Sequence, residues 1–380
     1  MRLHEHEAAR LFQQAGIPVP PFAVARTGDE AVAALERVQL PIVIKAQVLV
    51  GSRGKHGGIV VAETPEEVRE KARALLGSSV RGLSVESVMV ARKVSIGREL
   101  YVGATIDPAA GAITVILGVV GGIDVETIAH ERPEALFRLT VVPPDELRGY
   151  QARALAHEAG FRGDLMVKIA DVLVSLFRVF RKTDALIAEV NPLVVTADEA
   201  LWAVDAVLDV DDSALFRHPE LPGDSLARME HPLERAAKQI GVSYVDLDGD
   251  IAIISSGAGL GMATMDVVGQ RLRPANFLET GGGITEELMY KVTQLVLEKP
   301  GVRGLLINLY GGINPIHEGA KGVVRVLREK QVKIPVVAKA LGNRQEETWA
   351  TLSEGGVTVV TDITTEAAVE ALCAALGMDH

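Results

Sequence analysis

The sequence predicts a two-part α/β protein. Its first part, to roughly residue 215, mixes helices with antiparallel strands, and its second part, from Asp250, carries a doubly wound parallel sheet. Strand runs separated by a short glycine-rich stretch indicate a hairpin in the first part. Short apolar strands that alternate with helical stretches indicate the parallel sheet of the second. A chain of 380 residues is also too long for one ordinary core, so at least two domains are expected.

Hydrophobic periodicity places the elements of the first part. Residues 4–14 are expected to form an amphipathic helix, because apolar residues share one face until Gly16 ends it. Residues 41–50 and 59–62 are expected to form a hairpin around a glycine-rich tip at 51–58. The further elements, in chain order, are neighbouring strands at 89–90, 99–107 and 112–117, a helix over 165–181, and strands at 185–190 and 202–207.

Residues 216–241 are interpreted as the linker, because the periodicity weakens and three prolines appear, with one helix at 233–240. The strands expected after it are 251–254, 275–278, 304–309, 335–338 and 357–360, with helices such as 286–299 and 316–330. Ligands of such sheets bind beyond the carboxyl ends of the strands. Three glycine-bearing loops fall there, at 255–261, 281–283 and 311–315, and they suggest an anionic ligand.

Composition excludes several classes of protein. A net charge of −11 argues against nucleic-acid binding, because phosphate backbones attract basic faces. The longest uncharged stretch, 108–123, is too short to span a bilayer, so no membrane insertion is expected. The single cysteine, Cys373, fits a reducing compartment, and the polar, acidic start does not resemble a signal or transit peptide. A cytoplasmic location is therefore expected.

A first candidate site is the glycine-rich tip with Lys45 on the strand before it. Glycines allow backbone N–H groups to approach a phosphate, and Lys45, Arg53 and Lys55 bring positive charge. The tip is not a Walker A loop, because His56 stands where Ser or Thr would be required. A mobile turn with solvated basic residues explains the same sequence equally well.

A second candidate site combines Glu189 and Asn191 at the end of one predicted strand with Asp205 at the end of the next. The hard oxygen atoms of Asn and Asp side chains suit Mg²⁺, whose other ligands are waters and nucleotide phosphates. The alternative is an ordinary turn, since Asn-Pro is frequent at strand ends.

Two loops of the second part could contact an anion. The loop 257–261 resembles a dinucleotide fingerprint, but Met262 occupies a position that requires glycine. Asn314 and Pro315 predict a helix start, with Asn as the N-cap and Pro as the first helical residue. Its N–H groups would face an anion, although ordinary capping explains the pair as well. None of the nine histidines has an evident catalytic context, and His317 is expected to be solvated.

Several short stretches of the sequence are more informative together than singly. They are Leu3-His-Glu5, Lys45-Ala-Gln-Val48, Arg53-Gly-Lys55, Glu99-Leu-Tyr-Val-Gly103, Ala188-Glu-Val-Asn-Pro-Leu193, Ala214-Leu-Phe-Arg-His218, Gly257-Ala-Gly-Leu260, Pro274-Ala-Asn-Phe-Leu278 and Gly281-Gly-Gly283. In this order they closely resemble the β subunit of succinyl-CoA synthetase along nearly the whole chain. Their order and number make the resemblance far more specific than any single motif.

The resemblance implies an ATP-grasp domain over 1–232, with a small subdomain inserted at about 20–100, and a flavodoxin-like CoA-ligase domain over 233–380. It implies that a short dicarboxylate, CoA and ATP or GTP give acyl-CoA, as in the tricarboxylic acid cycle. A partner α subunit would supply the phosphohistidine and most of the CoA site, in an αβ or α2β2 assembly. The implied site residues are Lys45, Ser52, Arg53, Gly54 and Glu99 for the nucleotide, Asn191 and Asp205 for Mg²⁺, Glu189 near the phosphohistidine, and Ser256, Gly312, Ile313 and Asn314 for the acid.

The chain departs from the family pattern at several positions. Ser256 replaces an Asn beside the substrate, and Asn314-Pro315 begins a stretch that replaces Arg-Cys-Asp. Leu49 replaces a His, Ala91 replaces a Glu associated with the base, and Val207 replaces a Lys. Malate, citrate or another short acid would fit a paralogue with these changes. Two different classes of protein also stay open, namely a self-contained ATP-grasp carboxylate–amine ligase and a non-catalytic paralogue.

Overall fold

The chain forms two compact units in a computed structural model that describes residues 1–50, 53–229 and 231–378. The units are Met1–Gly223 and Asp224–His380. The division between them falls inside the predicted linker, 216–241. The predicted domain boundaries, 1–232 and 233–380, remain a prediction.

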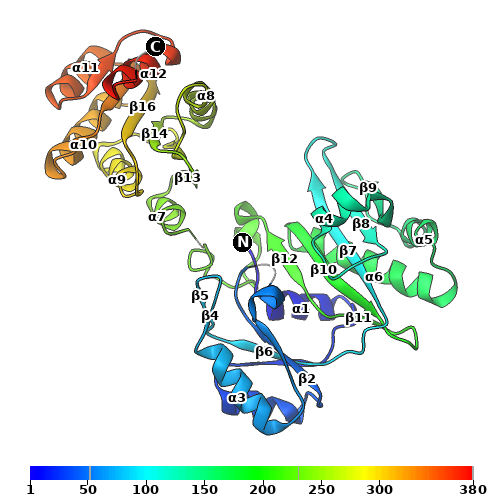
Figure 1. The fold of residues 1–380 in the computed structure, drawn as a ribbon. Helices are drawn as coiled ribbons and strands as arrows, with labels where there is room; N and C mark the ends of the chain where they lie inside the picture. Colours follow the sequence, from blue (N-terminus) through cyan, green and yellow to red (C-terminus); the bar gives the residue numbers. More distant parts are fainter. Residues whose placement is uncertain (51–52, 230, 379–380) are drawn as a thin grey trace. The chain divides into compact units, whose positions relative to one another are not determined.

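The first unit contains a small antiparallel sheet with the strand order β1-β6-β2-β3. Figure 1 shows two of its strands, β2 and β6, beside the helix α3. Its elements are β1 (Phe22–Ala25), α2 (Gly28–Ala33), η1 (Ala34–Glu36), β2 (Ile42–Ala46), η2 (Arg53–His56), β3 (Ile59–Ala62), α3 (Pro65–Leu76), the two-stranded pair β4 (Ser79–Val80) and β5 (Leu83–Ser84), and β6 (Val88–Arg92). The predicted hairpin is confirmed, since Lys45 pairs with Ile59 across β2 and β3. The strand predicted over 41–50 already ends at Ala46, and the tip contains the short helical turn η2.

A larger antiparallel sheet completes the first unit, with the order β11-β10-β7-β8-β9 and β12 beside β10. Its elements are α1 (Glu5–Gln14), β7 (Arg98–Asp107), β8 (Ala112–Gly118), α4 (Val125–Glu131), η3 (Pro133–Ala135), β9 (Leu136–Val141), α5 (Gly149–Glu158), α6 (Gly163–Lys182), β10 (Ala185–Val195), β11 (Leu201–Ala203), β12 (Val207–Val210) and η4 (Asp212–Arg217). The apolar side of α6, including Leu173 and Phe177, shares one core with the sheet and α1.

Two strand predictions for this unit are wrong. The strand at 89–90 belongs to the small sheet rather than beside 99–107. The strand predicted over 202–207 is two strands, because β11 and β12 pair with different parts of β10. The pairing of β10 with β7 shifts register between Val190 and Leu193. Beside this part of β10, residues 204–206 belong to neither β11 nor β12. Asp205 therefore lies in a connection and not at a strand end.

The second unit has a six-stranded sheet with the order β13-β15-β14-β16-β17-β18. Its elements are α7 (Pro232–Ile240), β13 (Ser243–Asp246), β14 (Ile251–Ser255), α8 (Ala258–Gly269), β15 (Asn276–Glu279), α9 (Glu286–Leu297), β16 (Gly304–Gly311), α10 (Ile316–Glu329), β17 (Val336–Gly342), α11 (Gln345–Glu354), β18 (Thr358–Val360) and α12 (Thr365–Ala375). All neighbouring strands are parallel except β13, which is antiparallel to β15.

Helices cover both faces of this sheet. Ile251 and Ile253 share a cluster with residues of α8 and α12, whereas Ala252 and Ile254 share one with residues of α9 and α10. This alternation confirms the predicted doubly wound parallel sheet. The antiparallel edge strand β13 was not predicted.

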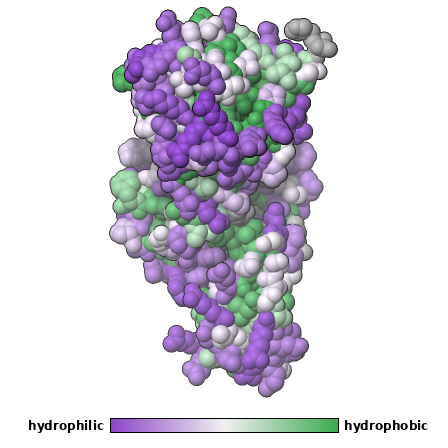
Figure 2. Space-filling model, turned by 90° about the vertical axis from the view of Figure 1, so that its left-hand side faces the viewer, coloured by the Kyte–Doolittle hydropathy of each residue, from purple (hydrophilic) through white to green (hydrophobic). Residues whose placement is uncertain are grey.

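Hydrophilic and hydrophobic residues are mixed over the face shown in Figure 2. Over the described residues, the structure contains no helix with the length and apolarity needed to cross a membrane.

His218 joins the end of the first unit to the rest of it. Its Nε2 lies 2.7 Å from Asp184 Oδ2, and its Nδ1 lies 3.2 Å from Glu220 Oε1. The hydrogen bond to Asp184 raises the pKa of His218 above its ordinary value. Stability from this contact is therefore complete below the unfolded pKa of about 6.5, and it is lost as the pH rises through the raised folded value.

The variant His218→Gln is expected to destabilise the first unit by about 0.5–1 kcal/mol at pH 6 and by less at pH 9. The effect is modest because the Asp184 side chain is 36% exposed. Urea unfolding of both proteins, followed through Trp202 in a Trp349→Phe background, measures the difference. The exposed His157, changed to Gln, is the control. An equal destabilisation at the two pH values would contradict the expectation.

Candidate functional site

A cavity of about 1000 Å³ lies within the first unit and is lined by residues of both its large and its small sheet. Most of the site residues predicted for the first unit border it: Lys45, Arg53, Gly54, Glu99, Glu189, Asn191 and Asp205. Ser52 and the side chain of Lys55 lie outside the part of the chain that the structure describes. The cavity thus brings together the two candidate sites predicted separately from the sequence.

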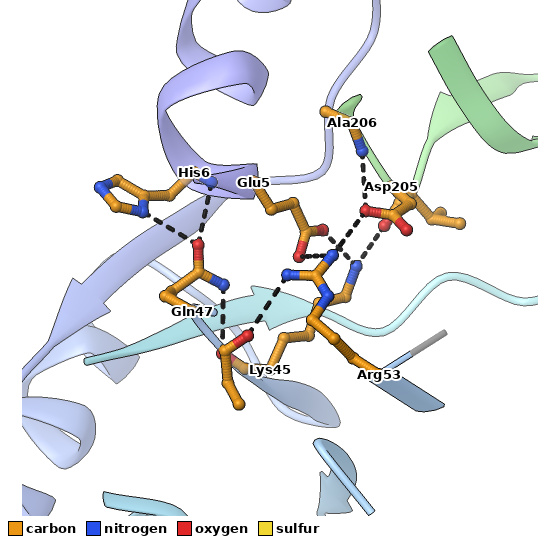
Figure 3. A network of polar contacts seen from close by, with 9 residues as sticks. Glu5, His6, Lys45, Gln47, Arg53, Asp205 and Ala206 are labelled. Atoms are coloured by element: carbon orange, nitrogen blue, oxygen red, sulfur yellow. Dashed lines mark hydrogen bonds and ion pairs between the residues drawn. The ribbon is translucent and has the colours of Figure 1, made fainter. Parts of the chain in front are cut away.

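Four charged side chains meet at one end of this cavity (Figure 3). Lys45 Nζ lies 2.6 Å from Glu5 Oε1, and it also donates to the backbone oxygen of Val204. Arg53 Nη2 lies 3.0 Å from Glu5 Oε2 and 3.0 Å from Asp205 Oδ1. Burial alone would raise the pKa of Asp205, but the cations Arg53 and Lys45 hold it below its ordinary value. Burial also raises the pKa of Glu5, against the opposing effect of Lys45 and Arg53.

Hydrogen bonds between side chains and the backbone fix the positions of these charged groups. Gln47 Oε1 accepts from His6 N at 3.0 Å, and Gln47 Nε2 donates to the Lys45 oxygen at 3.2 Å, so the start of α1 is tied to the end of β2. Arg53 Nη1 reaches back to the Ala46 oxygen at 3.3 Å. This contact folds the hairpin tip toward β2, and the guanidinium of Arg53 borders the cavity.

Asn191 and Glu189 lie inside β10, not at a strand end as predicted, because β10 continues to Val195. The Asn191 amide is oriented by Gly122 N, which donates to its Oδ1 at 2.8 Å, and by its own Nδ2, which donates to the Ile123 oxygen at 3.0 Å. The Tyr101 hydroxyl donates to Glu189 Oε2 at 3.3 Å. Burial raises the pKa of Glu189, which therefore holds a proton more readily than a surface carboxylate does.

Glu99 approaches the loop that holds Asn191. A Cβ on Gly122 would lie 2.6 Å from Glu99 Oε2, and Gly122 has a φ of +76°. Only glycine fits at this position without moving the carboxylate or straining the backbone. The loop therefore connects a predicted nucleotide residue with a predicted metal residue.

The predicted acid-binding residues lie in the second unit, beyond the carboxyl ends of its parallel strands. The Ser256 hydroxyl accepts from Tyr310 N at 2.9 Å and so joins the loops after β14 and β16. Asn314 Oδ1 would lie 4.0 Å from a Cβ on Gly282. Gly312 is exposed, and Ile313 is 96% exposed. These loops adjoin one another because parallel strands end at the same edge of a sheet.

Two sequence predictions at this edge are wrong. The helix α10 begins at Ile316 with Pro315 as its N-cap, because the ψ of Pro315, 69°, is not helical. His317 is buried rather than solvated, since the first turn of α10 packs inward. Its Nε2 lies 2.7 Å from Arg344 Nη1, so Arg344 donates to it, whereas Nδ1 is buried with no hydrogen-bond partner among the described residues. This contact brings the loop after β17 to the start of α10.

Glu5 is a residue of the site that the sequence analysis missed. It belongs to the matched stretch Leu3-His-Glu5 but was given no role. The spacing of residues in this helix could have identified it, because Glu5 lies on the same buried face of α1 as Ala8, Ala9 and Phe12. A carboxylate on an apolar stripe indicates a buried partner.

Comparison with known proteins matches both parts of the chain. Residues 2–195 match the family model of an ATP-grasp domain, and residues 254–372 match that of a CoA-ligase. The β subunit of a GDP-forming succinate–CoA ligase from Thermus thermophilus is 45% identical over 348 residues, 91% of this chain and 92% of the relative. An ADP-forming counterpart from Chloroflexus aurantiacus is 40% identical over 381 residues, 99% of this chain and all of the relative. The chain belongs to the succinate–CoA ligase β-subunit family.

Solved structures agree with this family at the level of the fold. An ATP citrate lyase from Methanosaeta concilii superimposes with a TM-score of 0.69 at 16% identity, and 99% of each chain is covered. One from Methanothrix soehngenii gives 0.65 at 18% identity, again over 99% of each. The predicted ATP-grasp and CoA-ligase folds are confirmed.

Three of the residues at which the sequence is expected to depart from the family pattern lie at this cavity. Leu49, Ala91 and Val207 all line it. These three side chains are apolar, and the charged residues Glu5, Lys45, Arg53 and Asp205 line the same cavity.

Proposed function

We propose that this chain is the β subunit of a ligase that joins a short dicarboxylate, with succinate the first candidate, to CoA at the expense of a nucleoside triphosphate. The observation that carries the proposal is the convergence of Lys45, Arg53, Asn191 and Asp205 on one cavity of the ATP-grasp unit. The names of the relatives, both ADP-forming and GDP-forming, support the same class of reaction.

The charges of the cavity suit a bound Mg²⁺–nucleotide. Lys45 and Arg53, with the N–H groups of the hairpin tip including Gly54 and Ser52, would bind the phosphates. The amide oxygen of Asn191 and the carboxylate of Asp205 are hard ligands that line the same cavity, so this donor set fits Mg²⁺. A bound Mg²⁺ would neutralise charge on the phosphates.

A partner is needed to complete the reaction. An α subunit would carry the phosphohistidine and most of the CoA site, and Glu189 would stand near that histidine. In the described part of this chain, the two buried histidines are engaged within the fold: both ring nitrogens of His218 face carboxylates, Asp184 and Glu220, and Nε2 of His317 faces Arg344. The reducing, cytoplasmic environment expected for such an enzyme agrees with one free, buried cysteine, Cys373.

The acid would bind at the loops that carry Ser256, Gly312, Ile313 and Asn314. Because the Ser256 hydroxyl is engaged with the Tyr310 backbone, it presents less hydrogen-bonding capacity than the amide of the Asn that it replaces. The acid loops thus differ from the family pattern in their polar groups, and malate and citrate are the alternatives to succinate. A self-contained carboxylate–amine ligase is the alternative that requires no partner.

Co-expression with candidate α subunits tests this proposal. CoA-dependent formation of ADP from ATP, or of GDP from GTP, is measured with succinate, malate and citrate in turn. We expect turnover with an α subunit and none by the isolated chain. An α subunit whose phosphorylated histidine has been replaced is the control. Turnover by the isolated chain, or none with any α subunit, would contradict the proposal.

A further inference from the structure

Glu5 is the most enclosed charge of the nucleotide cavity. Its side chain is 2% exposed, and it stands in the first turn of α1 among core residues. An unpaired carboxylate in this position would be strongly destabilising. Each oxygen instead faces a different cation, with Lys45 Nζ 2.6 Å from Oε1 and Arg53 Nη2 3.0 Å from Oε2 (Figure 3).

Asp205 is the second carboxylate of the cluster, and it differs from Glu5 in accessibility. It shares Arg53 Nη2 with Glu5, at 3.0 Å, but its side chain is 31% exposed. Two cations and two carboxylates balance in charge at this end of the cavity. A solute that enters the cavity can reach Asp205 far more easily than Glu5.

We propose that Glu5 is a positioning residue: its carboxylate is the permanent counter-ion of Lys45 and Arg53 and leaves Asp205 free to exchange from Arg53 to the Mg²⁺ of the nucleotide. The inference rests on the proposed function, because it takes Asp205 as a metal ligand. Without the charge of Glu5, Asp205 would be the single carboxylate facing two cations. Mg²⁺ would then compete against a stronger ion pair, while Lys45 and Arg53 would still attract phosphate.

A purely structural role for Glu5 predicts something different. Loss of a packing or folding contribution would lower stability and weaken nucleotide binding to a similar extent with and without Mg²⁺. The positioning role predicts a selective change, in which the Mg²⁺ concentration needed to strengthen nucleotide binding rises and Mg²⁺-free binding is preserved.

The variant Glu5→Gln tests the inference, since it removes the charge and keeps the shape. Binding of ATP to the full chain is titrated calorimetrically at increasing Mg²⁺, and the midpoint of the Mg²⁺-dependent gain is compared. We expect the midpoint to rise about tenfold, and Mg²⁺-free ATP affinity to stay within about threefold of that of the wild-type protein or to increase. An unchanged midpoint would overturn the inference.

Two further variants make the result specific. Glu7→Gln is the matched control, because Glu7 lies in the same helical turn but accepts from His4 N at 2.8 Å, and its midpoint should not move. Glu5→Asp keeps the charge on a shorter side chain and should raise the midpoint only about two- to threefold. A shift in Glu5→Asp as large as that in Glu5→Gln would show that charge is not the cause and would also overturn the inference.

Folding and function are kept separate in this design. If Glu5→Gln does not fold, Glu5→Met takes its place, because it also removes the charge and fills a similar volume. The same rise of the midpoint is expected, and an unchanged midpoint in that variant overturns the inference. Failure of the wild-type chain to bind ATP at all would count against the proposed function and is distinguishable from an unchanged midpoint.

Discussion

Replacing Lys45 with alanine is expected to lower the affinity for nucleoside triphosphate about 10- to 100-fold. Hydrogen bonds to charged groups contribute about 1.5–3 kcal/mol, and about 1.4 kcal/mol corresponds to a tenfold change in affinity. The Lys45 ammonium is placed for this role because Glu5 and the Val204 backbone hold it at the cavity wall. Removal also leaves Glu5 with Arg53 as its remaining cation in the cluster.

Titration of ATP into the full-length Lys45→Ala chain measures this loss. Lys71→Ala is the matched control, because Lys71 pairs with Glu67 at 2.9 Å on α3, outside the cavity. Far-ultraviolet circular dichroism and the unfolding midpoint show whether the variant is folded. An ATP affinity equal to that of the wild-type protein in a folded variant would exclude Lys45 as a phosphate-binding residue.

Replacing Asp205 with asparagine is expected to abolish the strengthening of ATP binding by Mg²⁺ while leaving Mg²⁺-free binding intact. The substitution removes the carboxylate that would hold the metal, yet Lys45 and Arg53 keep Glu5 as their counter-ion. Turnover with an α subunit should fall at least about 100-fold, because a metal ion stabilises developing charge by several kcal/mol.

The binding measurement for Asp205→Asn uses ATP with and without Mg²⁺. Asp198→Asn is the control, because Asp198 carries the same side chain in the turn between β10 and β11, where it contacts Thr196 and does not border the cavity. A Mg²⁺-dependent gain as large in Asp205→Asn as in the wild-type chain would remove Asp205 from the metal site.

Local patterns were sufficient for much of the fold. Two features depend only on residues that are close together in the sequence: the hairpin of β2 and β3, and the alternation of strands and helices after residue 250. Hydrophobic periodicity and the positions of glycines therefore predicted both. The same holds for the type of residue at the site: Lys45, Arg53, Asn191 and Asp205 were recognised by their chemistry and by the stretches in which they stand. None of these predictions required knowledge of which residues touch.

Tertiary structure decided which charges meet and where strands stop. Glu5 and Lys45 are 40 positions apart, and Arg53 and Asp205 are 152 positions apart, so no local pattern could predict that they form one cluster. The split of 202–207 into β11 and β12 depends on how β10 pairs with both. The burial of His317 depends on Arg344, which follows another strand. Periodicity reports the face that a residue occupies, whereas the partner across that face is set by the packing of distant elements.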